Sequence, residues 1–266
     1  MHWQRNIEVL TPLFNRGAYQ DTPEIRVPSI RGMVRWWFRA LGSTADDEKG
    51  IFGGMKKFGQ RLTKDVLASS LVFRVSNVLV EKAVATPTLP HKQSGQASPQ
   101  LAFPPGTTFR LDVFSRFGDS NSASWTKVER ALGVWLLLGS LGLRGNRSGG
   151  NVWPADGKEP KSPVELLAQL DQFGFRWPIM IAGSEVGTSV HQLRAAATDT
   201  VNGLEWVFGY AHGRERCASP LKFKIVRFGH DLRLLIFAPE QRILDEARRA
   251  LKGHRSKPET WTALRS

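Results

Sequence analysis

The sequence predicts an α+β fold of two tandem ferredoxin-like (RRM-like) domains with a glycine-rich loop, and three observations lead to this fold class. First, residues 1–155 give signals for strand, helix, strand, strand and helix, with a final strand possible at residues 151–153. This order is that of the split βαβ arrangement. Second, residues 164–266 repeat the order. Third, five glycines cluster in residues 139–150, directly after a helix pattern.

The first half contains two helix patterns among three strand patterns. Residues 7–14 and the β-branched runs 70–80 and 107–114 favour strands. Pro28 and Ser29 are typical of a helix start, and Gly42 marks the end of a helix that runs to Leu41. The second helix, residues 125–141, is apolar nearly all round and is therefore expected to be buried. Residues 86–106 hold five prolines and are predicted to form a long excursion outside the core.

The second half gives the same kinds of signal at shorter spacing. Strands are expected at residues 175–182, 221–228 and 232–237, with the last two joined as a hairpin around residues 229–231, and helices at residues 188–198 and 239–251. An echo of Phe52-Gly53 followed by a strand recurs at Phe208-Gly209, although chance stays open as its origin. Domains are predicted at residues 1–155 and 164–266, with a linker near residues 155–163.

Composition favours a polyanionic partner. The 266 residues include 37 Lys and Arg against 24 Asp and Glu, a formal net charge of +13, and contacts with phosphates release counterions. No apolar stretch approaches the roughly 20 residues that span a bilayer, and no signal peptide is visible at the N-terminus. A soluble, cytoplasmic protein without a membrane partner is expected.

Cys217 is the only cysteine, which excludes an internal disulfide and a cysteine-cluster zinc site. Cys217 is expected to pack as a small hydrophobic residue, and no metal or cofactor is predicted.

The predicted helix at residues 29–41 carries arginines on a face away from its apolar residues. Arg31, Arg35 and Arg39 recur every fourth residue, and residues 25–45 contain no acid. Like charges at this spacing repel, so the stripe is expected to need an external anion such as phosphate, with Trp36 beside it as a face for an unstacked base. A basic face that is simply solvated is the alternative. The apolar face, by contrast, should pack into the core; it comprises Ile30, Val34, Trp37 and Leu41.

The glycine-rich stretch at residues 139–150 combines close backbone access with positive charge. It includes Arg144, Asn146 and Arg147, and no acid occurs from residue 131 to residue 155. Exposed backbone N–H groups between glycines bind phosphate oxygens well. The stretch lacks the Gly-Lys-Ser/Thr ending of a nucleotide-hydrolysing loop and follows a helix instead of preceding one. A flexible surface turn is the alternative interpretation.

Several of these segments together resemble a known family. Residues 11–14, 17–18, 23–32 and 35–41 resemble the opening signature of the first-numbered subunit of type III-B (Cmr) CRISPR effector complexes, a family of the RAMP superfamily. Residues 52–54, 139–150 and 216–221 resemble later elements of the same family. Asn146, between Gly145 and Arg147, departs from the usual arginine-serine density of the loop. The resemblance implies two ferredoxin-like domains, a place at the guide 3′ end, neighbouring backbone subunits, and a projecting hairpin where residues 86–106 fall.

Patterns and resemblance together predict a non-catalytic RNA-binding subunit of a type III-B CRISPR effector complex. Its partners would be guide CRISPR RNA and target RNA, near the guide 3′ end, and other RAMP subunits. The predicted RNA-binding residues are Arg26, Ser29, Arg31, Arg35, Trp36, Arg39, Arg144, Asn146 and Arg147.

Two alternatives stay open. A metal-independent ribonuclease that processes guide precursors would use a histidine to activate a ribose hydroxyl, and a metal-dependent one would need an acid such as Asp21. A purely architectural subunit would use its nine tryptophans at protein interfaces. The basic stretch at residues 248–257 is expected to be solvated. The histidines available for catalysis are His2, His91, His191, His212, His230 and His254.

Overall fold

The computed structural model describes most of the chain. The described residues are 1–17, 19, 22–58, 61–92, 97–116, 122–199, 203–212, 215–252 and 258–266, with only the backbone described at residues 56–58, 61–65 and 211–212. Asp21, His254 and residues 253–257 of the basic C-terminal stretch lie outside these ranges, as does Ala18 of the N-terminal turn. Among the described residues, no helix is long and apolar enough to cross a membrane.

The first half forms an antiparallel four-stranded sheet with two helices. Its strands lie in the order β4-β7-β1-β8, so the first strand in the chain pairs with the third and the fourth. This is the strand order of a ferredoxin-like domain, as the sequence predicts. The elements are β1 (His2–Val9), α1 (Val27–Ala40), β4 (Leu71–Leu79), β7 (Thr108–Ser115), α3 (Ser122–Leu138) and β8 (Val152–Pro154).

The second half repeats this order on a second antiparallel sheet, β12-β13-β9-β14. The identical strand order in both sheets is consistent with two ferredoxin-like domains. The division at residues 155–163 stays a prediction. The elements of the second sheet and its helices are β9 (Ile179–Ala182), α5 (Val190–Thr198), β12 (Lys222–Phe228), β13 (Asp231–Phe237), α7 (Gln241–Leu251) and β14 (Trp261–Arg265).

Several elements differ from the sequence expectation. The helix α4 (Pro163–Gln172) and the strand β14 were not predicted. The strand covers only five residues, whereas the helix begins with an N-cap at Ser162 and a proline, which are ordinary start signals. The first strand ends at Val9 and not at Phe14, since the following residues leave the sheet and Leu13 pairs with Phe103 instead. Small elements complete the second half: η1 (Ser184–Val186), α6 (Glu205–Phe208), β10 (Tyr210–His212) and β11 (Glu215–Cys217).

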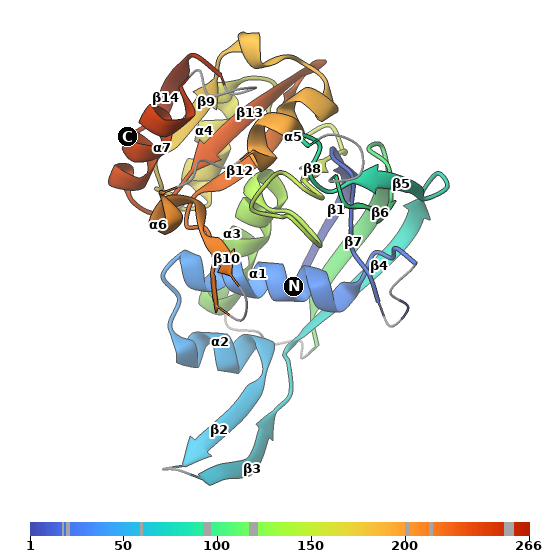
Figure 1. Cartoon of the computed structure of the whole chain (residues 1–266). Coiled ribbons are helices and arrows are strands. Elements are labelled where there is room, and N and C mark those ends of the chain that lie inside the picture. The colour runs from blue at the N-terminus through green and yellow to red at the C-terminus, as the bar shows by residue number, and fades with distance from the viewer. Residues whose placement is uncertain are drawn as a thin grey trace.

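The first half has a hairpin that was not predicted from the sequence, outside residues 86–106. A helix α2 (Ala45–Phe52) leads into the hairpin of β2 (Gly54–Phe58) and β3 (Arg61–Leu67), which extends away from both sheets (Figure 1). The proline-rich excursion forms the short pair β5 (Val84–Pro87) and β6 (Pro99–Ala102). The expectation that this excursion stays wholly outside the core is wrong, because Thr88, Ala97 and Ala102 are buried and Phe103 packs against the core.

Helix α1 lies where the two halves meet, next to α2 and α3 (Figure 1). Its predicted apolar face is confirmed: Ile30, Val34 and Trp37 are buried and Leu41 is partly buried. The indole of Trp37 stacks on Phe237 of β13 at 6.1 Å between ring centroids, and its edge meets Phe175 at 5.9 Å. One hydrophobic core therefore includes residues of both halves.

Candidate nucleic-acid interface

The glycine-rich segment, residues 139–150, is fixed at both ends by backbone hydrogen bonds. Leu143 donates to the carbonyl of Phe14 and Gly150 to that of Pro12, at 2.9 Å each. Gly142 has a φ of +75°, and a Cβ there would lie 2.4 Å from the Phe14 oxygen, so only glycine fits. Arg144 also has a positive φ, +61°. These contacts place Arg144 on an exposed bend over the junction of the two halves.

Strand β12 holds the same segment from the second half. The amide of Phe223 donates to the Asn146 carbonyl at 3.1 Å, and the amide of Ile225 donates to Asn151 Oδ1 at 2.7 Å. Lys224 is completely buried, and its Nζ donates to the carbonyls of Gly139 and Val152 at 2.6 Å each. Burial lowers the pKa of Lys224 well below its ordinary value. The glycine-rich segment is therefore positioned by both halves of the chain.

Arg147 is buried in this junction without an acidic partner among the described residues. Its Nη2 donates to the Phe208 carbonyl at 2.6 Å, and its guanidinium lies 5.3 and 5.0 Å from the ring centroids of Phe208 and Phe223. Its Nη1 is buried and has no hydrogen-bond partner within the described part of the chain. Burial, and next the charge of Arg144, lower the pKa of Arg147 to about 10. An unpaired donor at this site is costly unless a ligand accepts from it.

Two more cations lie near the arginines of the glycine-rich segment, Lys222 near Arg147 and Arg194 near Arg144. Lys222 Nζ donates to Asn146 Oδ1 at 3.0 Å and lies 4.6 Å from the Trp36 ring centroid; burial, and next the charge of Arg147, lower its pKa to about 8. Arg194 of α5 is buried, donates to the Pro87 carbonyl at 3.2 Å, and has its pKa lowered to about 10 by burial and then by Arg144. Neither residue forms an ion pair with another described residue.

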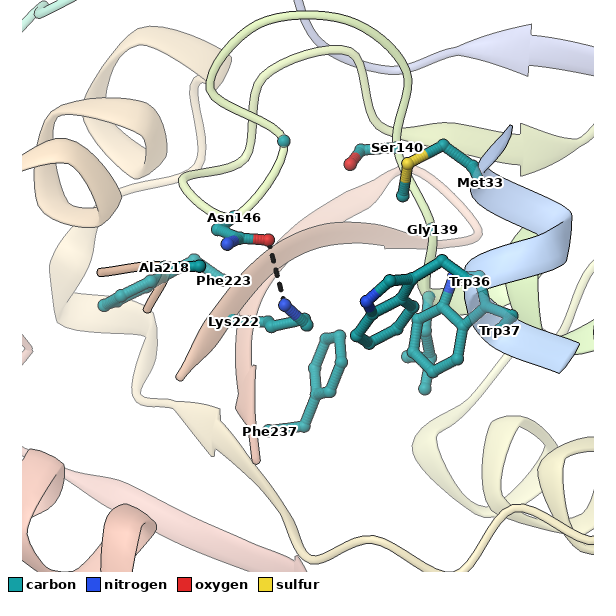
Figure 2. A pocket seen from close by; sticks show the side chains of 12 residues that line it. Met33, Trp36, Trp37, Gly139, Ser140, Asn146, Ala218, Lys222, Phe223 and Phe237 are labelled. Atoms are coloured by element: carbon teal, nitrogen blue, oxygen red, sulfur yellow. Dashed lines mark hydrogen bonds between the residues drawn. The ribbon is translucent and has the colours of Figure 1, made fainter. Parts of the chain in front are cut away.

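Two adjoining cavities open around the glycine-rich segment. The larger, about 530 Å³, is lined by Arg144, Arg147 and residues of the β10–β11 region. The smaller, about 200 Å³, is lined by Trp36, Trp37, Phe223, Phe237 and Lys222. Figure 2 shows Trp36, Trp37, Phe237 and Lys222 gathered around it from α1, β12 and β13, whereas the ring of Phe223 points to the other face of β12. The residues that line both cavities are Met33, Ser140, Gly145 and Asn146. Among the described side chains, no carboxylate or histidine lines either cavity.

The structure brings some of the predicted site residues together. Trp36, Arg144, Asn146 and Arg147 line one or other of the two cavities. Lys222 and Arg194 were not predicted. Lys222 and Lys224 alternate along a strand, which indicates that both lie on one face of it. Arg194 lies in an alanine-rich helix, where no sequence pattern indicates a binding role. Cys217, expected to be packed, is exposed at the rim of the larger cavity, because its short strand β11 lies outside the second sheet.

The arginine stripe on α1 has an internal acid, contrary to the sequence expectation. Glu48 of α2 is buried, and its Oε1 accepts from Arg35 and, at 3.0 Å, from Arg39. Arg31 donates to the Phe52 carbonyl, and burial, then Arg35, lower its pKa. The premise that the stripe needs an external anion is therefore wrong. Glu48 lies in the next helix, outside the acid-free residues 25–45, so the sequence of α1 does not indicate it.

The remaining predicted residues lie at the start of α1. Ser29 Oγ donates to Asn15 Oδ1 at 3.1 Å, and Arg26 pairs with Glu24 at 2.7 Å while donating to the Arg16 carbonyl at 3.1 Å. Neither residue lines the two cavities. Whether Arg26, Ser29, Arg31, Arg35 and Arg39 bind RNA stays a prediction.

The histidines whose side chains the structure describes are dispersed. His2 Nε2 lies 3.0 Å from Asp112 Oδ1, His91 Nδ1 lies 2.9 Å from Thr198 Oγ1, and His230 occupies the two-residue turn of the predicted β12–β13 hairpin. Only the backbone of His212 is described. Among the described residues, no three His, Cys, Asp or Glu side chains are grouped as a metal site requires.

The Glu48 pairs lead to a first prediction. Replacing Arg35 and Arg39 together with Gln leaves Glu48 buried and unpaired, so we expect a loss of roughly 1–3 kcal/mol in the free energy of unfolding. This is less than a fully buried pair would lose, because the two arginine side chains are 39% and 51% exposed and are screened by solvent. Urea denaturation measures the loss. Adding Glu48→Gln to the double variant should restore most of it, and a triple variant as unstable as the double one would contradict the pairing.

The model of the RAMP superfamily matches residues 6–153, more than half of the chain, and the chain belongs to this superfamily. It is related to the Cmr1 subunits of type III-B CRISPR complexes. The CRISPR system Cmr subunit Cmr1-2 of Pyrococcus furiosus is 26% identical over 55% of this chain and 91% of its own length, and subunit Cmr1-1 of the same organism is 30% identical over 55% and 43%.

Solved structures show the same fold over the whole chain. The apo crystal structure of Cmr1 from Pyrococcus furiosus matches with a TM-score of 0.61, at 18% identity, and covers 100% of this chain and 99% of that one. A chain of the type III-B Cmr-β complex bound to cognate target RNA matches with a TM-score of 0.51, at 12% identity, over 89% of this chain and 94% of that one. At these identities the likeness establishes the fold alone.

Proposed function

We propose that this chain is a non-catalytic subunit of a type III-B CRISPR effector complex and that it binds guide or guide-paired RNA, near the guide 3′ end, at the junction of its two halves. The observation that carries the proposal is the group of cations around the glycine-rich segment. Arg144, Arg147, Lys222 and Arg194 form no ion pair with another described residue, and Arg147 keeps a buried N–H without an acceptor. A phosphate backbone supplies the missing acceptors and charge.

The relatives support the choice of complex. Cmr1 subunits are components of Cmr systems by name, and the chain of the Cmr-β complex that shares this fold belongs to an assembly bound to target RNA. Other RAMP subunits would then be its protein neighbours. Binding is favoured over cleavage because, among the side chains that the structure describes, none at either cavity is a carboxylate or an imidazole that general acid–base chemistry would use.

Salt dependence tests the proposal. The affinity of the purified chain, alone and in the reconstituted complex, for single-stranded guide RNA should fall steeply between 50 and 200 mM salt, roughly in proportion to the number of phosphate contacts. Affinity that is independent of salt would contradict RNA binding and leave the architectural alternative. Incubation with repeat RNA and EDTA checks the ribonuclease alternative, which cleavage at a defined position would favour.

The pKa of Lys222 leads to a second prediction. A protonated Lys222 attracts phosphate, so raising the pH from 7 to 9, through its pKa of about 8, should weaken RNA binding by up to about tenfold, the size of one charged hydrogen bond. Lys222→Arg should remove this dependence, because arginine keeps its charge. Titration of RNA by fluorescence anisotropy at each pH measures both.

Unfolding does not account for such a loss. The pKa of Lys222 is about 8 in the folded chain, and its ordinary value is 10.5. Between these two pH values the unfolded chain binds more protons at Lys222 than the folded chain does, so the contribution of Lys222 to stability rises with pH. If wild type and Lys222→Arg lose affinity equally on raising the pH, Lys222 does not contact the RNA.

A further inference from the structure

The smaller cavity has the size and lining of a site for one flat ring. Its volume is about 200 Å³, whereas a cavity of about 150 Å³ in another protein holds one benzene molecule. Its aromatic walls are the rings of Trp36, Trp37 and Phe237, and its polar groups are Lys222 and Asn146 (Figure 2). A whole nucleotide is too large for this space, but a single base is not.

The polar groups of the cavity are mainly donors. Lys222 has three N–H donors, of which one is directed to Asn146 Oδ1 at 3.0 Å. The indole N–H of Trp37, which is 1% exposed, has no acceptor within the described part of the chain. A ring that carries carbonyl acceptors at its edge therefore suits the cavity better than one that carries only donors. Pyrimidine bases have such carbonyl groups, and they are the smaller of the two classes of base.

The cavity adjoins the cationic one, and the two share Met33, Ser140, Gly145 and Asn146. A ligand that occupies both at once has a flat ring on one side and an anionic group a short distance away, at Arg144 and Arg147. A nucleotide within an RNA strand has this composition. The aromatic rings favour a base that has left its stack, because base–aromatic stacking replaces the stacking that is lost.

We infer that the cavity between Trp36, Phe237 and Lys222 receives one unstacked pyrimidine base of the bound RNA, while the phosphate next to that base lies against Arg144 and Arg147. The inference rests on the proposed function and adds a position of base preference to it. Trp36 and Phe237 supply the stacking surface, and Lys222 donates to a ring carbonyl. The site is formed by residues of both halves, so it exists only when the two halves are packed together.

An abasic scan tests the inference. The probe is oligouridylate trimmed to the shortest length that binds with full affinity, so that a single register is available, with one uridine at a time replaced by an abasic residue. At one position the wild-type protein should lose about tenfold in affinity, as expected for one stacked base, and adenine at that position should also weaken binding. The other positions should change little.

A variant that blocks the cavity completes the test. Ala218 is exposed at the edge of the cavity, and Ala218→Trp should fill it without removing a cation. This variant should lose about tenfold in affinity for intact RNA, keep the salt slope, and be insensitive to the abasic residue. Ala263→Trp, at an exposed position of β14, is the matched control and should behave as wild type. Thermal melting of both checks the fold.

The outcomes separate the two proposals. A sensitive position in wild type that disappears in Ala218→Trp supports the base site. Salt-dependent binding with no sensitive position, or with one that persists in Ala218→Trp, overturns the base site and leaves the proposed function intact. Absence of salt-dependent RNA binding overturns both.

Discussion

Replacing Trp37 with alanine is expected to lower the free energy of unfolding by roughly 3–5 kcal/mol, the usual cost of removing a buried tryptophan. Trp37 is 1% exposed and contacts aromatic residues of the second half, stacking on Phe237 and meeting Phe175 and Trp177. Truncation therefore leaves a cavity between the two halves. Urea denaturation followed by circular dichroism measures the loss.

A matched control distinguishes this packing from a general effect of losing a tryptophan. Trp206 of α6 is 43% exposed, and Trp206→Ala should change stability by at most about 0.5–1 kcal/mol. Equal stabilities of the two variants would mean that Trp37 does not join the halves. Because Trp37 also lines the smaller cavity, Trp37→Ala tests the packing of the halves through its stability and not through its RNA affinity.

Replacing Arg144 and Lys222 together with glutamine is expected to cost about 100-fold in RNA affinity at moderate salt. Each charged hydrogen bond contributes roughly 1.5 kcal/mol or more, about tenfold in affinity, and both residues lie beside the cavities without an ion pair to a described residue. The slope of log affinity against log salt should shrink by about 0.7 for each of the two side chains that contacts a phosphate of the single strand, so a decrease of about 0.7 is expected where Lys222 donates to a base. Anisotropy titrations from 50 to 300 mM salt measure both quantities.

The control for charge is a pair of arginines on α7. Arg242 and Arg249 are 75% and 67% exposed at their side chains and lie in a different element. The double variant Arg242→Gln, Arg249→Gln also removes two positive charges, so its loss of affinity measures the effect of the overall electrostatic field of the protein. If both double variants lose affinity equally, the RNA does not bind preferentially at the junction of the two halves.

Local patterns made much of the fold predictable. The apolar face of α1, the buried helix α3 and the β12–β13 hairpin follow from periodicity over one segment. The element order then leads to the strand order of each sheet, since few arrangements satisfy it. Short elements such as β14 gave too few residues for a pattern. The hairpin β2–β3 follows α2 as an insertion between α1 and β4, and nothing in the order of the main elements requires it.

The site was less predictable, because its charges are set by contacts between distant segments. Glu48 pairs with arginines of another helix, and Lys222 reaches Asn146 across 76 residues of sequence. The sequence of α1 shows that this helix carries arginines and no acid, but it does not show whether another element supplies an acid to them. That the glycine-rich segment approaches a ligand closely stays a prediction from its own sequence. Lys222 and Arg194, by contrast, come from β12 and α5 and could be placed near it only by the tertiary structure.

Crosslinking of RNA to the chain tests the central claim most directly. Guide RNA that carries 4-thiouridine is irradiated in the reconstituted complex, and the adducts on this chain are located by mass spectrometry. The account predicts adducts in residues 139–150 and around Trp36 and Lys222, with loss of these adducts in the Arg144→Gln, Lys222→Gln variant. Adducts confined to other surfaces, such as α7 or the β2–β3 hairpin, or protein crosslinks without any RNA adduct, would contradict it.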